Sequence, residues 1–421
     1  MPLLPKIREL SFLVYGLGAT GRSVVKFLIK NKIKKISVWD DKEVSFLKKL
    51  RPKNLSQAFK QVDFIVLSPG ISLLKNKKLR KFKKKIITDI DLFYLTKNRP
   101  KSIVVTGTNG KSTTCKLLAH LLKKNKYKIF LGGNIGNPIL NLKSQKNFVI
   151  IEASSFQLAH SKFICPNYAF FLNFSNDHLD WHGTKENYLN SKLRIFRLQN
   201  KNHYALINKN LKNFFRKKNF ASKLILPRKK DYTKIKFKIK NDYLTSYLNS
   251  ENMSFIYTFS KLVRIKDENF IKSMKSFKGL PHRFEIFLKR NGITFINDSK
   301  ATSFKATESA LTDLKNIYWI LGGLPKKADK ISISRYKKNI IKCYLIGKNI
   351  NFFKNQIKNK LVFSITKNLK KSVIKILKDC KLEKQKNKFV LLSPAAASFD
   401  QFSNFEKRGE EFKRLCNRYA K

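Results

Sequence analysis

The 421-residue sequence predicts an α/β protein of three domains, each built on a mostly parallel sheet. Two glycine-rich turns, in residues 16–21 and 107–110, each stand between an apolar strand and a helix. A further series of alternating apolar strands and helices fills the last segment. We therefore expect a Rossmann-like domain over residues 1–95, a central P-loop ATPase-like domain over 96–280 and a Rossmann-like α/β domain over 281–421.

Composition supports folded domains without membrane insertion. Apolar residues make up 42% of the chain, yet no apolar run approaches the roughly 20 residues that a membrane helix needs. The five cysteines lie far apart, with no C-x-x-C pair and no metal-ligand spacing. This usage is typical of reduced thiols, so we expect a cytoplasmic protein.

The chain carries a large excess of positive charge. Lysine and arginine number 90 against 27 acidic residues, a net charge of +63. Such an excess ordinarily indicates nucleic acid or an anionic membrane surface. Here the lysines are spread over every segment and accompany abundant Asn, Ile and Phe, which favours compositional drift, and a positive field also attracts multiply anionic substrates. We expect weak non-specific nucleic-acid binding and no specific nucleic-acid function.

The first segment carries a dinucleotide-type fingerprint. An apolar strand over residues 10–15 precedes Gly16–Gly21, which reads G-x-G-x-x-G, and Asp40 ends the next strand about 20 residues on. Taken alone, this pattern indicates NAD. Gly70 ends the following strand, but no catalytic residue of a dehydrogenase stands nearby. We therefore favour a nucleotide-sugar diphosphate in this cleft.

The second glycine-rich turn predicts a phosphate-binding loop. Gly107 and Gly110 can adopt backbone angles that turn peptide N–H groups onto an anion, and Lys111 adds a positive charge. Ser112–Thr113 open a helix whose amino end favours phosphate, and a hydroxyl there can reach magnesium. The strict P-loop spacing is not met, because Val105 stands at its first glycine. A tight connection is the alternative, although packing alone does not explain Lys-Ser at a helix start.

Polar residues follow the strands of the same domain. Glu152 ends an apolar strand, where a buried carboxylate needs a partner such as a cation. His178 follows the next strand, and the helix after it carries Lys192. The turn at Gly132–Pro138 faces the same edge. If the strands are parallel, these groups and the P-loop converge on one site.

The remaining stretches supply scaffold. Residues 234–240, KIKFKIK, alternate in polarity and predict a strand in an edge or surface hairpin. Asn249 and Asn252 open a helix, and residues 279–283 form a rigid turn that we expect to be a hinge.

The wording TGTNGKST, rather than the generic P-loop pattern, resembles the Mur ligases, ATP-dependent amide-forming enzymes that build the peptide stem of peptidoglycan. Matches continue in family order over essentially the whole chain: GLGATG, SPGI, GGNIGNP, IEASSFQL, NDHLDWH, SKLRIF, GLPHRFE, NDSKATS, LGGLPKKAD and SPAAASFDQFSNFEKRGEEF. The closing segment is the most specific of these. It resembles the branch that adds D-glutamate, whereas the relatives that add diaminopimelate or lysine and the folylpolyglutamate synthases share the P-loop but are not expected to share this ending.

The resemblance implies an acid–amino-acid ligase. ATP is converted to ADP and phosphate as D-glutamate is joined to UDP-N-acetylmuramoyl-L-alanine through an acyl phosphate, in cell-wall biosynthesis. A monomer is expected. The alternatives are another Mur-type or folylpolyglutamate-type amino-acid ligase and a nicotinamide-dependent Rossmann enzyme.

The same resemblance implies a set of site residues. ATP would be bound by Gly107, Thr108, Asn109, Gly110, Lys111, Ser112, Thr113, Asn249, Asn252 and Arg283. Magnesium would be held by Ser112, Glu152, His178 and Lys192, the last as a carbamylated lysine, and catalysis would fall to Lys111, His178 and Lys192. The UDP-sugar would contact Ala19, Thr20, Asp41, Lys42, Gly70 and Asn134. D-Glutamate would contact Thr302, Lys326, Ser398, Phe399 and Phe405.

Two stretches depart from the sequence pattern of the family. Leu324-Pro325 and Lys327 stand where the family often has a polar residue and glycines, which bears on Lys326 as a glutamate ligand. Asp41-Lys42 replaces the more usual Thr-Arg, which bears on the contact with uracil or phosphate.

Overall fold

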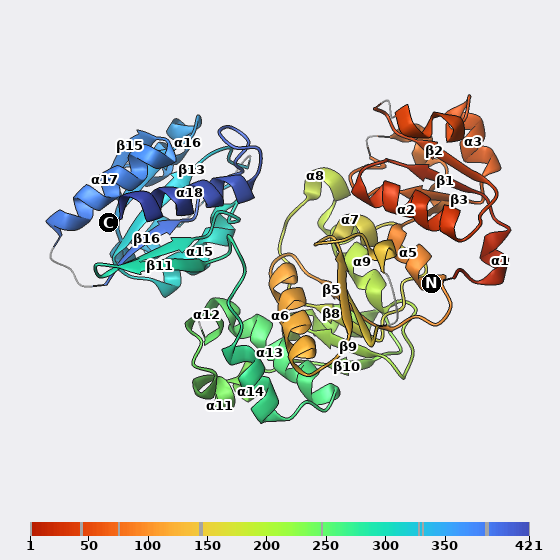
Figure 1. The fold of residues 1–421 in the computed structure, drawn as a ribbon, viewed down its shortest axis with the longest axis horizontal. Helices are drawn as coiled ribbons and strands as arrows, with labels where there is room; N and C mark the ends of the chain where they lie inside the picture. Colours follow the sequence, from red (N-terminus) through yellow and green to blue (C-terminus); the bar gives the residue numbers. More distant parts are fainter. Residues whose placement is uncertain are drawn as a thin grey trace. The chain divides into compact units, whose positions relative to one another are not determined.

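A computed structural model describes residues 2–42, 45–74, 76–142, 146–245, 247–326, 329–330, 332–383 and 387–420, which contain three sheets (Figure 1). The chain divides into two compact units, one of residues 1–239 with 251–277 and one of residues 240–250 with 278–421. The predicted α/β class with parallel sheets is confirmed. The predicted domain limits at residues 95 and 280 stay predictions.

The first sheet has the order β2-β1-β3-β4, and all its pairs are parallel. Alternate side chains of β1 point to opposite faces: Val14 packs with Val24 of α2, and Leu13 packs with Phe59 of α3. The elements of this region are α1 Pro5–Arg8, β1 Phe12–Tyr15, α2 Ala19–Lys30, β2 Ile36–Trp39, α3 Leu55–Gln61, β3 Phe64–Leu67, α4 Lys77–Arg80, β4 Ile86–Ile87 and α5 Asp89–Tyr94, with 3₁₀ turns η1 Ser45–Leu50 and η2 Lys83–Lys85.

The second sheet has six parallel strands in the order β10-β9-β8-β5-β7-β6. Its strands are β5 Lys101–Thr106, β6 Ile129–Gly133, β7 Phe148–Glu152, β8 Tyr168–Phe171, β9 Tyr204–Ile207 and β10 Lys223–Ile225. The helices of this region are α6 Lys111–Lys124, α7 Ser155–Leu158, α8 Leu179–His182, α9 Lys185–Leu193, α10 Lys212–Lys217, α11 Lys229–Ile239, α13 Tyr247–Leu262 and α14 Asp267–Lys275, with 3₁₀ turns η3 Ile139–Asn141, η4 Arg194–Phe196 and η5 Lys209–Leu211.

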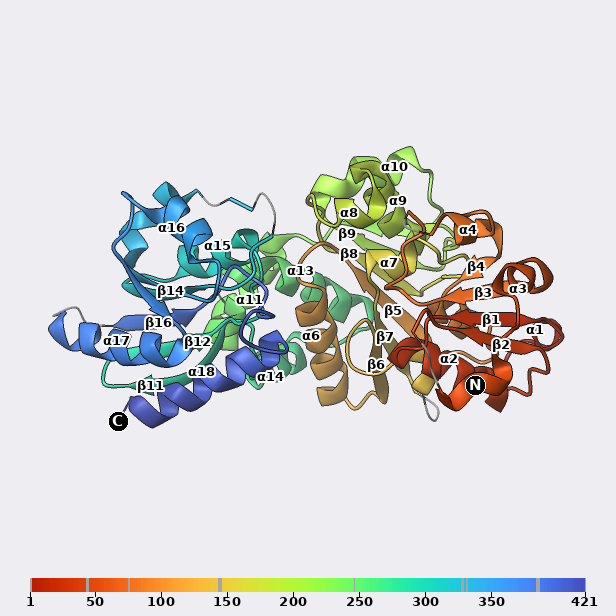
Figure 2. The same cartoon turned by 90° about the horizontal axis from the view of Figure 1, so that it is seen from above.

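Helices cover both faces of the second sheet, which explains its apolar strands. Helix α6 packs on β6 and β7 (Figure 2), and Phe255 and Phe259 of α13 pack on Phe170 of β8. On the opposite face, Leu193 of α9 shares a buried cluster with Phe171.

A buried carboxylate joins the first and second sheets. Asp91 of α5 accepts hydrogen bonds from the backbone N–H groups of Thr88, Lys162 and Phe163, at 2.9, 2.8 and 2.7 Å. Burial raises the pKa of Asp91 to about 6 despite these donors. Nearby, Gln157 donates to Asp89 at 3.3 Å. Both sheets therefore belong to one compact unit.

The third sheet, in the second unit, has the order β11-β12-β16-β13-β14-β15. Only the β11–β12 pair is antiparallel among its described pairs. Helices α15 and α16 pack on one face and α17 and α18 on the other. The elements are α12 Asp242–Thr245, β11 Glu285–Arg290, β12 Ile293–Asn297, α15 Phe304–Asp313, β13 Ile317–Gly322, β14 Ile340–Ile346, α16 Ile350–Ile357, β15 Phe363–Lys367, α17 Leu369–Leu382, β16 Lys388–Leu392 and α18 Phe405–Tyr419, with 3₁₀ turns η6 Ile333–Arg335 and η7 Lys337–Asn339.

The strand predicted over residues 234–240 is wrong, because these residues continue α11. Tyr232, Ile235 and Ile239 are buried at spacings of three and four residues, which is the period of a helix. Phe237, which a strand would place on the same face as Ile235 and Ile239, is 80% exposed. The alternation of KIKFKIK is therefore a lysine-rich coincidence on an amphipathic helix.

Two further expectations concern membrane insertion and the state of the cysteines. None of the helices in the described ranges combines the length and apolar character of a membrane span. All five cysteines are free, and Cys165 alone among them is only half-buried.

A matched pair of variants distinguishes a helix from a strand at residues 234–240. Ile239→Ala should lower the free energy of unfolding by about 2–5 kcal/mol, because Ile239 is fully buried. Phe237→Ala should change it by less than about 0.5 kcal/mol. Urea unfolding followed by circular dichroism measures both, and equal losses in the two variants would favour the strand.

Candidate active site

The candidate site lies at the carboxyl edge of the second sheet, where β7, β5 and β8 end side by side. The parallel register pairs Val105 of β5 with Glu152 of β7, and Thr106 of β5 with Phe171 of β8. The P-loop follows β5, Ala153 follows β7 and Asn173 follows β8. The parallel strands on which the predicted convergence depends are therefore present.

The P-loop has the backbone that its glycines predict. Gly110 has φ +81° and caps α6, and Gly107 has φ +157°. A Cβ on Gly110 would lie 2.5 Å from Oδ1 of Asn252 in α13, so α13 closes on the loop. Lys111 curls back to donate from Nζ to the carbonyl oxygens of Gly107 at 2.8 Å and Thr108 at 2.9 Å. Asn252 and Lys111 therefore both lie at the loop, and their contact with ATP stays a prediction.

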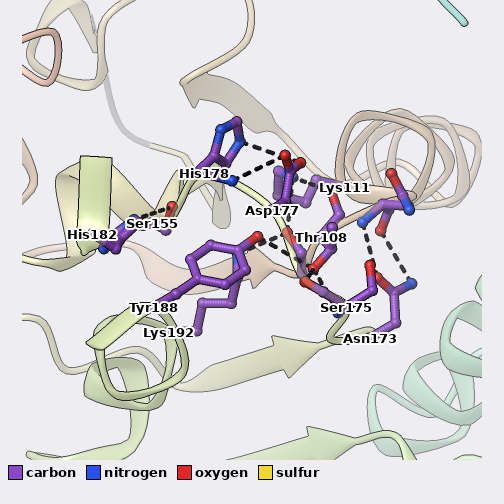
Figure 3. A network of polar contacts seen from close by, with 12 residues as sticks. Thr108, Lys111, Ser155, Asn173, Ser175, Asp177, His178, His182, Tyr188 and Lys192 are labelled. Carbon is purple, nitrogen blue, oxygen red and sulfur yellow. Dashed lines mark hydrogen bonds and ion pairs between the residues drawn. The ribbon is translucent and has the colours of Figure 1, made fainter. Parts of the chain in front are cut away.

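The segment after β8 holds the P-loop in place (Figure 3). Asn173 accepts from Thr108 N through its carbonyl oxygen at 3.0 Å and from Asn109 N through Oδ1 at 2.9 Å. Ser175 N donates to Thr108 Oγ1 at 3.1 Å, and the Thr108 hydroxyl lies 3.2 Å from that of Tyr188. The loop conformation is therefore fixed by side chains from the next strand and from α9.

Glu152 is a buried carboxylate with one unsatisfied oxygen. Only 3% of the residue is exposed. Its Oε1 accepts from Nδ2 of Asn134 at 3.0 Å, whereas Oε2 is buried and has no hydrogen-bond partner. A bare buried carboxylate oxygen is costly, so the site suits a cation. No group of three or more His, Cys, Asp and Glu side chains among the described residues is placed to hold a metal, so a cation here needs other ligands as well.

Lys192 is a buried amine beside the P-loop. The residue is 1% exposed, and its Nζ donates to the Gly107 carbonyl oxygen at 2.9 Å. Its Nζ lies 4.5 Å from the ring centroid of Tyr188, and the two side chains run alongside each other (Figure 3). Burial, with the nearby charge of Lys111, holds the pKa of Lys192 well below its usual value. The side chain is therefore suited to be a neutral amine.

His178 stands on the turn that starts α8. Its backbone is left-handed, with φ +53°, and its ring packs 4.8 Å from that of Phe156. Its Nε2 lies 3.5 Å from Oδ2 of Asp177. The buried His182 contacts Ser155 Oγ through Nε2 at 2.9 Å, and burial lowers its pKa to about 4.

Sequence analysis missed the residues that support this site. Asn173, Ser175 and His182 carry no motif spacing of their own. Tyr188 could have been found, because it precedes Lys192 by four residues and so shares its face of α9. Asp177 could also have been found from its place beside His178.

The predicted UDP-sugar residues lie at the carboxyl edge of the first sheet, except one. Ala19 and Thr20 form the first turn of α2, and Gly70 follows β3. Asp41 Oδ1 accepts from Tyr15 Oη at 2.8 Å and from Trp39 Nε1 at 3.2 Å. Lys42 N donates to Asp40 at 2.9 Å. The exception, Asn134, contacts Glu152 at the second sheet.

The predicted glutamate residues gather in the second unit, at the carboxyl ends of the adjacent strands β12, β16 and β13. Leu324 and Ala397 pair through two backbone hydrogen bonds of 2.9 Å, which join the segments of Lys326 and Ser398. Lys300 Nζ lies 4.7 Å from the ring centroid of Phe405. The remaining predicted contacts are Thr302, which precedes α15, and Phe399, which is exposed.

A buried arginine that the sequence analysis missed ties this region together. Arg408 of α18 donates from Nη2 to the carbonyl oxygens of Ser299 at 2.8 Å and Ala396 at 2.9 Å. Its Nη1 is buried without a partner. Asp298 beside it accepts from Ser393 Oγ at 2.8 Å, and burial raises its pKa to about 7.

Two predicted ATP contacts belong to the second unit. Asn249 donates from Nδ2 to the Tyr243 carbonyl oxygen at 2.8 Å, and Arg283 closes a turn on Leu280. Their approach to the nucleotide stays a prediction. Lys327 of the variant loop lies outside the described residues.

Comparison with known proteins agrees with this geometry. Residues 105–273 match a family model described as "Mur ligase middle domain", and residues 11–90 match one described as "Mur ligase MurD-like, N-terminal domain". A UDP-N-acetylmuramoylalanine--D-glutamate ligase of Rickettsia bellii is 36% identical, covering 96% of each chain. One of Francisella tularensis is 35% identical, covering 96% of this chain and 95% of the relative.

Solved structures share the fold at lower identity. A MurF ligase of Thermotoga maritima in complex with ADP gives a TM-score of 0.59 at 16% identity, covering 98% of this chain and 96% of that one. The MurC ligase of the same organism gives 0.55 at 16% identity, covering 97% of this chain and 100% of that one.

The P-loop geometry generates a test. Gly110→Ala should weaken ADP binding at least about tenfold, since alanine at φ +81° costs about 1–2 kcal/mol and its Cβ would displace Asn252. Isothermal titration with ADP measures the loss. Gly18→Ala, at a glycine with no atom within 4 Å of its Cβ position, is the control. An unchanged Kd in Gly110→Ala would mean that this loop does not cradle the nucleotide.

Proposed function

Because the chain belongs to the Mur ligase family, we propose that it joins D-glutamate to UDP-N-acetylmuramoyl-L-alanine at the expense of ATP, in peptidoglycan synthesis. The observation that supports the proposal is similarity over nearly the full length, at 31–36% identity, to ligases that are named for this activity. Other Mur ligases share the fold at far lower identity. The match of residues 11–90 to a MurD-like domain disfavours a nicotinamide enzyme. We take the active form to be a monomer.

We assign the phosphates of ATP to the P-loop. Lys111 Nζ now bonds the loop's own carbonyl oxygens, and phosphate oxygens would replace these acceptors when the nucleotide binds. The hydrogen bonds that Asn173 accepts from Asn109 N and that Ser175 N donates to Thr108 keep the loop in shape before the nucleotide arrives, so binding costs little reorganisation.

We assign magnesium to Ser112, Glu152 and His178. The fit rests on the unsatisfied Oε2 of Glu152, because a buried carboxylate oxygen without a donor is rarely retained for packing. When bound, the ion would neutralise phosphate charge. Among these ligands only Glu152 supplies a carboxylate, so the ion would still need a further anionic ligand.

We propose that Lys192 supplies the missing anion as a carbamate. Its neutral Nζ would attack the carbon of CO₂; an N–C bond forms, one C–O π pair moves onto oxygen, and the amine proton leaves to solvent. The lowered pKa and the position against Gly107 support this assignment, because an ammonium there would repel a metal ion.

The reaction then follows from positioning. The alanine carboxylate of the UDP-sugar attacks the γ-phosphorus of ATP, ADP leaves, and an acyl phosphate results. The amine of D-glutamate attacks the acyl carbon, phosphate leaves with the C–O electron pair, and the amine loses a proton. Lys111 offsets the negative charge that both steps concentrate at the phosphate.

We assign D-glutamate to the carboxyl edge of the third sheet. Thr302 and Ser398 would offer hydroxyls to its carboxylates and Lys326 a charge, while Phe399 and Phe405 would enclose the chain. Arg408 fixes the backbone of Ser299 and Ala396, so it positions the segments from which Thr302 and Ser398 extend.

Phosphate release tests the proposal. The protein with ATP, magnesium and UDP-N-acetylmuramoyl-L-alanine should release phosphate only when D-glutamate is added. Lysine and meso-diaminopimelate serve as matched amino-acid controls. Release with either of these and none with D-glutamate would refute the substrate assignment.

The carbamate has its own test. Lys192→Ala should abolish ligation with the fold intact, and millimolar formate or acetate should restore part of the activity by occupying the vacated anionic position.

Lys192→Arg is the matched control. It should stay inactive with or without formate, because guanidinium keeps its charge and cannot form a carbamate. Near-normal turnover in Lys192→Ala without added carboxylate would remove Lys192 from the metal site.

A further inference from the structure

The amino edge of the second sheet carries a cavity that the ligase reaction does not use. Its volume is about 480 Å³, a size typical of small-molecule sites. Strand β5 starts at this cavity with Ser102 and ends at the P-loop, so the two sites lie at opposite ends of one strand.

The cavity joins the segment between the first two sheets to the second sheet itself. Lys97 and Arg99 come from the connecting segment, and Asn167 and His203 stand directly before β8 and β9. Lys97 is anchored by its backbone, which donates to the Pro2 carbonyl oxygen at 2.9 Å. All of these residues belong to one compact unit.

The cations alone do not distinguish this cavity, since lysines cover the whole chain. What distinguishes it is a pair of neutral side chains, each of which has one polar atom already engaged by a backbone N–H group. Asn167 uses its acceptor Oδ1 on Ser102 N at 2.8 Å, which leaves the Nδ2 amide as a donor. No described residue accepts from that Nδ2.

The tautomer of His203 is likewise set by a hydrogen bond to one of its two ring nitrogens. Its Nδ1 accepts from Asn200 N at 3.1 Å, so the neutral ring carries its proton on Nε2. Burial lowers the pKa of His203, which favours this neutral form. The imidazole therefore also leaves a donor, and it does so without a net charge.

The lining thus offers donors and positive charge and no carboxylate. Nη1 of Arg99 donates to the carbonyl oxygens of Tyr94 and Thr96, which fixes the guanidinium group. The other guanidinium nitrogens are left as donors for a ligand. Among the described residues that line the cavity, none is Asp or Glu. An anion with several oxygens meets these requirements, and four donor groups suit the four oxygens of a phosphate better than the two of a carboxylate.

We propose that this cavity, lined by Lys97, Arg99, Asn167 and His203, is a second ligand site that binds a phosphate-bearing small molecule. The site is separate from the P-loop and from the UDP-sugar cleft, and it does not depend on the assigned ligase reaction.

Cys165 provides a local readout, because it lines the cavity and is the one half-buried cysteine of the chain. Its thiol donates to the Leu198 carbonyl oxygen, and burial raises its pKa, so alkylation by iodoacetamide is followed at pH 8.5 by mass spectrometry. Inorganic phosphate is the probe, with sodium chloride of equal ionic strength as the blank; no nucleotide is added, because its phosphates would compete for the proposed site. At about five times its Kd, phosphate should slow alkylation of Cys165 about sixfold.

Two variants separate a built site from general attraction to a basic chain. Asn167→Asp keeps an acceptor for Ser102 N and replaces the donor with a negative oxygen, so protection should vanish. Lys97→Gln should weaken it. Lys101→Gln removes a neighbouring exposed lysine that does not line the cavity and should leave protection unchanged.

Three results would overturn the proposal. They are equal alkylation rates in phosphate and chloride, protection that survives in Asn167→Asp, and protection lost equally in Lys101→Gln and Lys97→Gln. Protection by citrate equal to that by phosphate would contradict phosphate as the anchoring group.

Discussion

The parallel pairing of β5 with β7 and β8 is the constraint on which the candidate site depends. Because all three strands run in one direction, the P-loop, Glu152 and the segment of Asn173 leave the sheet at the same edge. A shift of β7 by one residue would turn Glu152 to the other face and remove it from the loop. The apolar strands therefore act in function as well as in packing, since their register fixes which polar groups meet.

Buried polar groups at this edge are left less than fully satisfied. Glu152 keeps one oxygen without a donor, and Lys192 keeps an amine whose charge is disfavoured by burial and by Lys111. Burial of each group costs free energy, and for Lys192 the attraction of Asp177 does not outweigh that cost. In the function that we propose, a bound cation would neutralise the carboxylate of Glu152 and a carbamate would replace the buried amine of Lys192. The hydrogen bond from Lys192 to Gly107 holds the amine against the P-loop.

Short local motifs account for most of what could be predicted from the sequence. Glycines with defined angles, such as Gly110, and polar residues at strand ends, such as Glu152, leave signals within a few positions. Residues 234–240 misled because period-two alternation in a lysine-rich stretch coincides with helical burial of Ile235 and Ile239. Arg408 could not be found, because its partners Ser299 and Ala396 are remote in sequence and become neighbours only when β12 and β16 pair. Interactions that depend on sheet order are invisible until the order is known.

The distribution of acids gives the large positive charge a structural sense. Asp91 and Asp298 are buried among backbone and hydroxyl donors, and the buried Glu152 accepts from Asn134. Acids in these places satisfy the interior and do little to offset lysines at the surface. The resulting field extends about one Debye length, roughly 8–10 Å at physiological salt, and favours the approach of anionic substrates without specifying any of them. Specificity must then come from oriented donors, such as the amide that we propose as a ligand contact at Asn167, whose Oδ1 is already engaged by the backbone N–H of Ser102.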